Sequence, residues 1–296
     1  MNKVANYVDQ LSVSLVGQFI YYCMPWRKQL VLSNMKQAFG NQLSDQQRRK
    51  LAQAFYGHLA RSLKEMVQMR FMNEAKLKSK VDVIGWEHLA DVAANGKGML
   101  VLTGHFGSWE FAPIGGILNF KQFQGQFHFI RKTLGAKWLE KIVFRNYFKA
   151  GLHVIPKKNS LNQVRDALEA NHAIVFVMDQ HAIVSNRDGI AVEFFGKKAG
   201  TYRSLASFSR YADVPVVPAS AYRTQDNRHV LHFHPPIPWE EKGSTQESIY
   251  YNTLKYNQVL EQFINDHPEQ WLWLHKRWKL KESNLQPQSD PLRDFQ

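Results

Sequence analysis

Short apolar runs alternate with helix-like segments from Val81 onward, and this alternation constrains the fold more than any other feature of the chain. Uninterrupted apolar runs bounded by turn residues are typical of strands that are buried on both faces. The runs predict strands at Val81–Ile84, Met99–Leu102, Gln126–Arg131, His153–Ile155, Ala173–Met178, Ala191–Phe194, Val214–Ala221 and Val230–Phe233. Strands that alternate with helices predict an α/β fold with a largely parallel sheet and helices on both faces.

The segments between the strands predict the helices. The expected helices are Trp86–Ala94, a helix from Ser108 to Leu118, Leu134–Lys149, Ser160–Glu169, Tyr202–Ala212 and Gln246–His267. Residues 28–78 precede the sheet and have helical periodicity throughout, with a capping start at Ser44. The simplest division is a single α/β domain over residues 27–296, preceded by an N-terminal helical appendage over residues 1–26.

The sequence GMLVLTGHFGSWEF, Gly98 to Phe111, places a histidine and a carboxylate around one tight turn. His105 follows the strand, and Glu110 lies in the first turn of the helix that Ser108 is expected to cap. Residues five apart diverge on one straight helix, but they can converge across a strand-to-helix turn. Gly104 and Gly107 permit the close backbone path that such a turn requires.

His105 and Glu110 therefore form a candidate catalytic dyad. Histidine exchanges a proton near neutral pH and serves as a general base, while a bonded carboxylate fixes its tautomer. A capped helix after a strand would explain Ser108 and Glu110 without catalysis, so this alternative stays open from the spacing alone.

Two further charged residues follow predicted strands. Arg131 ends the strand Gln126–Arg131, and Asp179 comes directly after Ala173–Met178. Ligands in open α/β sheets bind outside the carboxyl ends of the strands, so Arg131 and Asp179 are expected near His105. Arg131 is a candidate for stabilising an oxyanion or gripping a phosphate, and Asp179 for positioning Arg131 or a substrate hydroxyl. A surface arginine and a turn aspartate are the alternatives.

The charge balance predicts an anionic partner. Lys and Arg number 38 against 25 acidic residues, which gives a formal net charge of +13. Nucleic acid, an anionic membrane surface and an acidic carrier protein are all compatible with this excess. Eight Trp and eleven Tyr favour the membrane surface. The single cysteine, Cys23, excludes an intrachain disulfide and a cysteine metal cluster, and a reducing compartment is the simpler assumption.

Residues 10–26 are free of charged side chains and are followed at once by Arg27 and Lys28. A membrane-spanning helix needs about 20 mainly apolar residues, and this segment is shorter and contains polar side chains. An apolar stripe at helical spacing runs through Val4, Val8, Leu11, Leu15, Phe19 and Tyr22. The preferred interpretation is one helix in the membrane interface, ended by Pro25. A marginal span and a helix packed on the domain core are the alternatives.

Other common catalytic classes find little support in the sequence. No HExxH, CxxC, GxSxG or GxGxxG motif occurs, so neither a metal centre, a serine nucleophile elbow nor a nucleotide cofactor is expected. His232 and His234 would share one face of a strand, but no carboxylate ligand is evident beside them. The C-terminal PEQWLWLHKRWK, Pro268 to Lys279, combines tryptophans and cations, including Arg277, in a way that suits a headgroup layer, a nucleic acid or a core-anchoring segment.

Taken together, these motifs resemble the late acyltransferases of lipid A biosynthesis, the lauroyl and myristoyl transferase family of Gram-negative bacteria. GHFGSWE resembles the HxxxxD/E active-site motif of that family. The other matching segments, in order, are LSNMKQAFG (Leu32–Gly40), GWEHL (Gly85–Leu89), FIRK with Arg131, MDQ with Asp179 and Gln180, FFGKKAGT (Phe194–Thr201) and PEQWLWLHKRWK. The sequence after MDQ, HAIVSNRDG, departs from the family pattern and leaves the acceptor open.

The resemblance implies a glycerol-phosphate-acyltransferase-like fold and transfer of a fatty acyl group from an acyl carrier protein thioester to a hydroxyl of a lipid A precursor. His105 would be the general base and Glu110 its orienting carboxylate. No cofactor beyond the acyl carrier protein thioester, a co-substrate, is implied. The other implied site residues, for oxyanion stabilisation or substrate binding, are Arg131, Asp179, Gly107, Ser108, Gln180 and Arg277.

The resemblance also implies partners and a location. The partners would be the acyl carrier protein, an anionic lipid acceptor and the surface of the bacterial inner membrane on its cytoplasmic face, with no nucleic acid. The same chemistry on another glycolipid or on a polyene lipid is one alternative. A basic membrane-binding protein without catalysis is the other.

Overall fold

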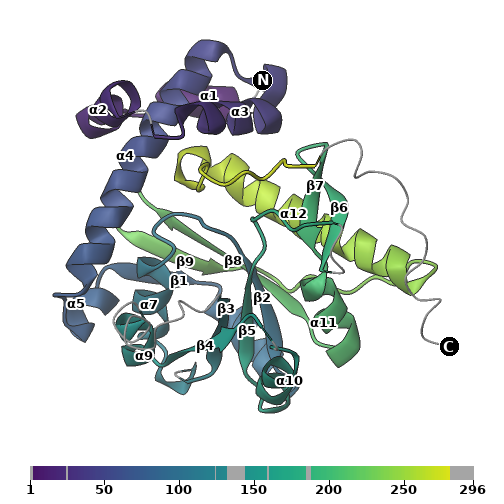
Figure 1. The fold of residues 1–296 in the computed structure, drawn as a ribbon. Helices are drawn as coiled ribbons and strands as arrows, with labels where there is room; N and C mark the ends of the chain where they lie inside the picture. Colours follow the sequence, from purple (N-terminus) through teal and green to yellow (C-terminus); the bar gives the residue numbers. More distant parts are fainter. Residues whose placement is uncertain are drawn as a thin grey trace.

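The central sheet of the computed structural model has the strand order β1-β9-β8-β2-β5-β3-β4 (Figure 1). The structure describes residues 3–24, 26–123, 125–131, 144–158, 160–184 and 188–280. The strands of this sheet are β1 Val81–Ile84, β2 Met99–Thr103, β3 Phe127–Arg131, β4 Leu152–Pro156, β5 Ala173–Val177, β8 Val216–Arg223 and β9 His229–Phe233. Each corresponds to a predicted strand, with ends that differ by at most two residues.

The sheet is parallel except where β8 pairs with β9. β2 lies between β5 and β8, and Leu100 pairs with Ile174 on one side and Val216 on the other. The predicted largely parallel sheet is therefore confirmed. Because β2, β5 and β3 are consecutive neighbours, their carboxyl ends lie at one edge of the sheet, and the residues that follow them are brought together.

Alternate residues of the buried strands face two separate apolar cores. Leu100 and Leu102 pack in one core, whereas Met99 and Val101 pack in the other. The first core is covered by α10 Leu161–Glu169, α11 Ser204–Ala212 and α12 Thr245–Asp266. The second core is covered by α6 Trp86–Ala93, α7 Phe111–Ile117 and α9 Arg145–Lys149. Helices thus cover both faces, as predicted. Residues 134–143 of the predicted Leu134–Lys149 helix, and the basic tail from residue 281, lie outside the described residues.

A two-stranded antiparallel hairpin, β6 Gly189–Phe194 and β7 Lys197–Tyr202, lies beside α12 and apart from the main sheet (Figure 1). The predicted strand at Ala191–Phe194 belongs to this hairpin, but its partner was not predicted. The predicted helix from Tyr202 was wrong at its start, because Tyr202 is the last residue of β7 and α11 begins at Ser204. Phe195 and Gly196 both have positive φ, as a tight two-residue hairpin turn requires.

The N-terminal region contains five α-helices among its described residues. They are α1 Lys3–Gln10, α2 Leu15–Cys23, α3 Lys28–Phe39, α4 Asp45–Met69 and α5 Glu74–Lys78, with a 3₁₀ turn η1 at Gly40–Gln42. Ser44 and Gln47 form a capping box at the start of α4, so the predicted capping start is confirmed. The helical character of residues 28–78 is likewise confirmed.

The prediction of one continuous helix within residues 1–26 is wrong. The helix is interrupted between Gln10 and Leu15, and the Ser14 side chain begins α2 by accepting a hydrogen bond from the Gly17 N–H at 3.1 Å. The interruption splits the apolar stripe, because Val4 and Val8 are buried in the core while the side chains of the stripe on α2 face outward. Pro25, the predicted terminator, lies outside the described residues.

The two N-terminal helices are attached to the domain in different ways. α1 reaches the C-terminal end of α12, where Lys3 pairs with Asp266 at 2.9 Å and Tyr7 bonds to Glu269. α2 instead lies across α4 at the upper left of Figure 1. None of the described helices combines the length and the apolar character that crossing a membrane demands.

Close backbone approach holds α2 against α4. A Cβ atom built on Gly17 would lie 2.3 Å from the Gln53 carbonyl oxygen and 2.9 Å from the Gly57 nitrogen. We expect Gly17→Ala to lower the free energy of unfolding by about 1–3 kcal/mol, because the helices must separate to admit the methyl group. Urea denaturation of the purified protein measures this change. Leu15→Ala is the matched control, since Leu15 is 83% exposed on the outer side of the same helix. Equal stability of the two variants would contradict the close crossing.

Candidate active site

His105 and Asp179 form a bonded pair at the carboxyl edge of the sheet. The Asp179 Oδ1 atom lies 2.9 Å from Nδ1 of His105, and its Oδ2 atom accepts the backbone N–H of His105 at 2.8 Å. The two residues follow the adjacent parallel strands β2 and β5, which explains why they meet. Asp179 is fully buried, whereas the His105 side chain keeps 18% of its surface exposed. The imidazole is therefore held by a carboxylate on one side and remains accessible.

The pair is electrostatically coupled. Burial by itself would lower the pKa of His105, but the charge of Asp179 and its hydrogen bond outweigh burial, so the pKa lies above the ordinary 6.5. Burial by itself would raise the pKa of the Asp179 carboxyl. The charge of His105 and the hydrogen bonds from His105 and Trp271 hold that pKa well below its usual range. Asp179 is thus ionised at neutral pH and favours the Nδ1–H tautomer of His105, which leaves Nε2 with the lone pair.

The carboxylate that bonds to His105 is Asp179 and not Glu110, which corrects the expected geometry of the dyad. Glu110 accepts a hydrogen bond from Arg131 at 3.0 Å. The Arg131 guanidinium lies over the rings of Phe144 and Tyr147, with its central carbon 4.9 and 5.3 Å from their centroids. The site therefore contains two adjacent charge pairs, and Glu110 affects His105 only through space, by raising its pKa.

Arg131 keeps its positive charge in this setting. Burial by itself would lower the pKa of its guanidinium, but Tyr147 and Glu110 raise it by more. The Arg131 side chain is 33% exposed, so part of its donor surface is available to a substrate oxygen. Asp179 was expected to position Arg131 or a substrate hydroxyl, but its oxygens accept bonds from His105 and Trp271.

Gly107 turns the chain between the two charge pairs. It has φ of +56°, and a Cβ atom there would lie 2.6 Å from the Ala221 carbonyl oxygen, so the close path expected of this glycine is confirmed. Its N–H donates to the Gln270 carbonyl at 2.9 Å and its carbonyl lies 3.0 Å from Nε2 of His58. The Gly107 N–H is therefore not available to an oxyanion, which corrects that expectation.

Ser108 does not cap a helix. α7 begins at Phe111, and the Ser108 Oγ atom has no hydrogen-bond partner within the described part of the chain. Ser108 is also fully buried, so its N–H does not face an accessible site. Among Gly107, Ser108 and Arg131, the structure leaves Arg131 as the accessible candidate for stabilising an oxyanion.

Arg277 supports the fold and does not line the site. It is fully buried, and it donates to the carbonyl oxygens of Gly200 and Gln180, to the Thr201 hydroxyl and to Asn257. Its guanidinium lies over the Phe194 ring, and burial lowers its pKa to about 10. Burial and these hydrogen bonds contradict the substrate-binding role expected for Arg277, because its side chain does not reach an accessible surface. The Gln180 carbonyl is the acceptor of one of these bonds, at 3.3 Å, and the substrate-binding role expected for Gln180 stays a prediction.

The family described as bacterial lipid A biosynthesis acyltransferase matches residues 7–280. The chain belongs to this family. It is an acyltransferase, and the resemblance inferred from its motifs is confirmed.

Individual relatives are distant but span most of the chain. The lipid A biosynthesis lauroyltransferase of Escherichia coli (strain K12) is 23% identical over 91% of this chain and 85% of its own length. The lipid A biosynthesis palmitoleoyltransferase of the same organism is 23% identical over 88% of this chain and 82% of its own length. The crystal structure of the 1-acyl-sn-glycerophosphate acyltransferase PlsC from Thermotoga maritima is 16% identical, with a TM-score of 0.38, and covers 90% of this chain and 99% of its own.

Two side chains of the candidate site come from the C-terminal segment and are not among the residues predicted from the sequence. The buried Trp271 indole donates to Asp179 Oδ2 at 2.9 Å. The His275 ring lies 5.3 Å from that of His105, and its Nε2 atom has no hydrogen-bond partner among the described residues. The motif PEQWLWLHKRWK is visible in the sequence, but nothing in it shows that this segment packs against the turn after β2. There the Leu272 N–H donates to the His105 carbonyl at 3.1 Å.

Histidines outside the site form their own clusters. His232 and His234 share a face as predicted, and their rings stack with centroids 3.9 Å apart. Across the described ranges, no group of three or more His, Cys, Asp or Glu side chains has an arrangement that could hold a metal ion.

Proposed function

We propose that this acyltransferase moves a fatty acyl chain from an acyl carrier protein thioester to a hydroxyl group of a lipid A precursor, at the cytoplasmic face of the bacterial inner membrane. The observation that carries the proposal is the His105–Asp179 pair, an accessible imidazole held by a buried carboxylate in a chain of this family. The curated relatives are named for lauroyl and palmitoleoyl transfer, so the length of the acyl chain is left open.

The geometry supports direct transfer without an acyl-enzyme. Nε2 of His105 removes the proton from the acceptor hydroxyl, and the resulting oxygen nucleophile attacks the thioester carbonyl. The new C–O ester bond forms, the C–S bond breaks, and the proton passes from His105 to the departing sulfur, which leaves as the thiol. Arg131 stabilises the negative charge that develops on the carbonyl oxygen, and Glu110 holds Arg131 in place.

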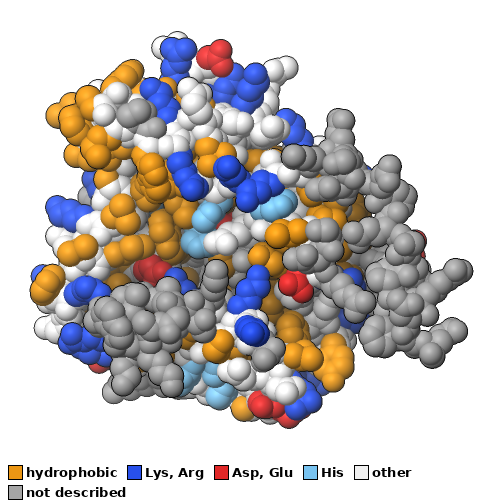
Figure 2. Space-filling model, viewed as in Figure 1, with side chains coloured by type: hydrophobic (Ala, Val, Ile, Leu, Met, Phe, Trp, Pro, Cys, Tyr) orange, Lys and Arg blue, Asp and Glu red, His pale blue; other side chains and the backbone are white. Residues whose placement is uncertain are grey.

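An exposed apolar face supports membrane association. We call it the α2–α4 apolar face, and it consists of Leu15, Val16, Phe19, Tyr22, Met24, Trp26, Leu63, Val67 and Phe71, each at least 51% exposed. Figure 2 shows hydrophobic side chains gathered over α2 and along α4, toward histidine side chains near the middle of this view. Soluble monomers rarely expose so many large apolar side chains together, and a lipid surface would cover them.

The face also places cations beside aromatic rings. The Lys28 ammonium lies 5.6 Å from the centroid of the Tyr22 ring, and the Arg27 guanidinium lies 5.8 Å from that of Trp26. Aromatic rings with adjacent cations suit the headgroup layer of an anionic membrane. The net charge of +13 suits both that layer and an acidic carrier protein.

Introducing charge into the α2–α4 apolar face is expected to weaken membrane binding. The double variant Phe19→Glu, Val67→Glu should lower the partition coefficient onto anionic vesicles by about 10²-fold, because each buried apolar side chain contributes about 1.5–3 kcal/mol. Co-sedimentation with phosphatidylglycerol-containing vesicles measures this. Leu161→Glu is the control, since Leu161 is 61% exposed on α10, away from the face. Equal binding of the double variant and wild type would contradict the membrane role of this face.

Two assays test the proposed reaction. Purified protein with an acyl carrier protein thioester and a lipid A precursor should give an ester product whose mass exceeds the precursor by one acyl chain. A total lipid extract serves as a second acceptor source, which detects another glycolipid or a polyene lipid. A product only from the extract would overturn the lipid A precursor as acceptor, and no product from either would overturn the reaction. Lipid mass spectrometry of a deletion strain identifies the acceptor in the cell.

A further inference from the structure

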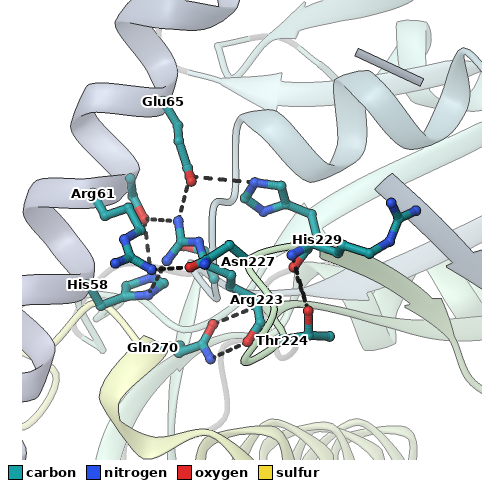
Figure 3. Close-up of polar contacts among 11 residues, drawn as sticks. His58, Arg61, Glu65, Arg223, Thr224, Asn227, His229 and Gln270 are labelled. Carbon is teal, nitrogen blue, oxygen red and sulfur yellow. Dashed lines mark hydrogen bonds and ion pairs between the residues drawn. The ribbon is translucent and has the colours of Figure 1, made fainter. Parts of the chain in front are cut away.

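A buried polar network lies behind the turn that carries the active site, and the reaction described above does not use it. His58 and Glu65 extend from α4 toward Arg223, the last residue of β8 (Figure 3). Arg223 donates to Nδ1 of His58 at 2.8 Å and to the Glu65 carboxylate. Arg223 is only 6% exposed, so the network lies between α4 and the sheet.

The network fixes the tautomer of His58. A guanidinium can only donate, so Nδ1 of His58 must accept, and the ring proton lies on Nε2. Burial, followed by the charge of Arg223, lowers the pKa of His58 to about 3, so the ring is neutral at physiological pH. The Nε2–H group then donates to the Gly107 carbonyl at 3.0 Å. A charged pair is thereby connected through one imidazole to the active-site turn.

Gly107 is held from the opposite side as well. Gln270, in the 3₁₀ turn η3 Pro268–Gln270, accepts the Gly107 N–H through its carbonyl. The Oε1 atom of Gln270 accepts the backbone N–H of Arg223 at 2.7 Å, and its Nε2 atom donates to the backbone carbonyl of Arg223 at 2.9 Å. The backbone C=O and N–H of Gly107 therefore bond to His58 and Gln270, and both of these residues bond to Arg223. Figure 3 shows the contacts of Arg223 with His58 and Gln270.

We propose that His58, held by Arg223 and Glu65, is a positioning residue for acyl transfer, which fixes Gly107 and so sets the relative placement of His105 and Glu110. The proposal rests on the proposed function. Gly107 lies between His105, paired with Asp179, and Glu110, paired with Arg131. A rotation of the Gly107 carbonyl moves one pair relative to the other. Misplacement of reacting groups by about 1 Å costs up to about 10²-fold in rate.

The variants His58→Phe and His58→Gln separate positioning from packing. Phenylalanine fills the ring volume but makes neither hydrogen bond, whereas glutamine can donate to Gly107 and accept from Arg223. We expect His58→Phe to lower kcat by about 10- to 100-fold with both KM values within about twofold of wild type. His58→Gln should restore most of kcat. The acid limb of the kcat/KM profile of His58→Phe should move to lower pH, because His105 loses its best alignment with Asp179.

Arg223→Lys provides an independent variant if His58→Phe does not fold. Lysine keeps the positive charge beside Glu65 but cannot bridge Glu65 and His58 with a planar fork, so the tautomer of His58 is no longer fixed. Its kcat should fall in the same way. Arg61→Leu is the matched control, because Arg61 links α4 to Asn227 beyond β8 without contacting Gly107 (Figure 3).

The outcomes distinguish the two proposals. If wild type transfers no acyl group, the proposed function fails, and the variants are not needed to show it. If wild type is active while folded His58→Phe and Arg223→Lys keep wild-type kcat and pH profiles, the positioning role is overturned. The positioning role would also be overturned if these two variants changed only the melting temperature, by the same amount as Arg61→Leu. The network would then contribute to packing alone.

Discussion

Replacing His105 with alanine is expected to lower kcat for acyl transfer by about 10⁴-fold, because the variant lacks the base that removes the hydroxyl proton. The KM values should change little, since the imidazole contributes to the transition state more than to binding of either substrate. The assay is formation of the acylated lipid at saturating acyl carrier protein thioester, followed by mass spectrometry. The folded state is checked by thermal unfolding.

His153→Ala is the matched control, since His153 is an exposed histidine on β4 that is paired with neither Asp179 nor Glu110. It should retain wild-type activity. If His105→Ala keeps its rate within tenfold of wild type, another group removes the proton. His275, whose ring lies 5.3 Å away, would then be the next residue to replace.

Most of the fold could be predicted from the sequence because buried strands have a local signature. Met99–Thr103 is apolar on both faces, and its ends are marked by Gly98 and Gly104. The β6–β7 hairpin has this signature only in β6, since KKAGTY of β7 is polar and small. Its position depends on α12 and on the buried Arg277, which are distant in sequence. Local periodicity contains no information about those contacts.

The N-terminus shows a second limit. Hydrophobic periodicity is continuous from Val4 to Tyr22, and it does not reveal whether one helix or two carry it. Ser14 was present as a capping signal, but an uncharged stretch with helical spacing favoured continuity. For α1 the structure agrees with the core-packed alternative, because Val4 and Val8 are buried, whereas α2 exposes its part of the stripe.

The sequence indicates the charged residues of the candidate site, but it does not indicate which of them form hydrogen-bonded pairs. His105, Glu110, Arg131 and Asp179 were all singled out, and all four lie at one edge of the sheet. Their pairing depends on the strand order, in which β5 separates β2 from β3. Sequence proximity favoured Glu110 as the partner of His105, whereas adjacency of β2 and β5 selects Asp179. The prediction for Arg277 failed because a segment rich in cations and tryptophans is expected at the surface. The buried acceptors of Arg277, at Gln180, Gly200 and Thr201, are not evident from the sequence.

Asp179→Asn is expected to lower kcat by about 10³-fold although it preserves the shape of the side chain. The reason is the distribution of donors around the carboxylate. The Trp271 indole and the His105 backbone N–H both donate to Oδ2, so the asparagine carbonyl oxygen must occupy that position. The amide NH₂ then faces Nδ1 of His105 and donates to it. The ring proton moves to Nε2, and the nitrogen that should accept the hydroxyl proton no longer can.

The pH profile gives this prediction a second measurement. His105 acts as a base only when neutral, so kcat/KM falls as pH decreases through its pKa, which in the wild type lies above 6.5 because of Asp179. Removing that charge lowers the pKa of His105, so the acid limb of Asp179→Asn should shift to lower pH while the plateau drops. Asp213→Asn, a change in an exposed ion pair with Lys97, is the control. An unshifted acid limb together with a rate within tenfold of wild type would show that Asp179 does not orient the base.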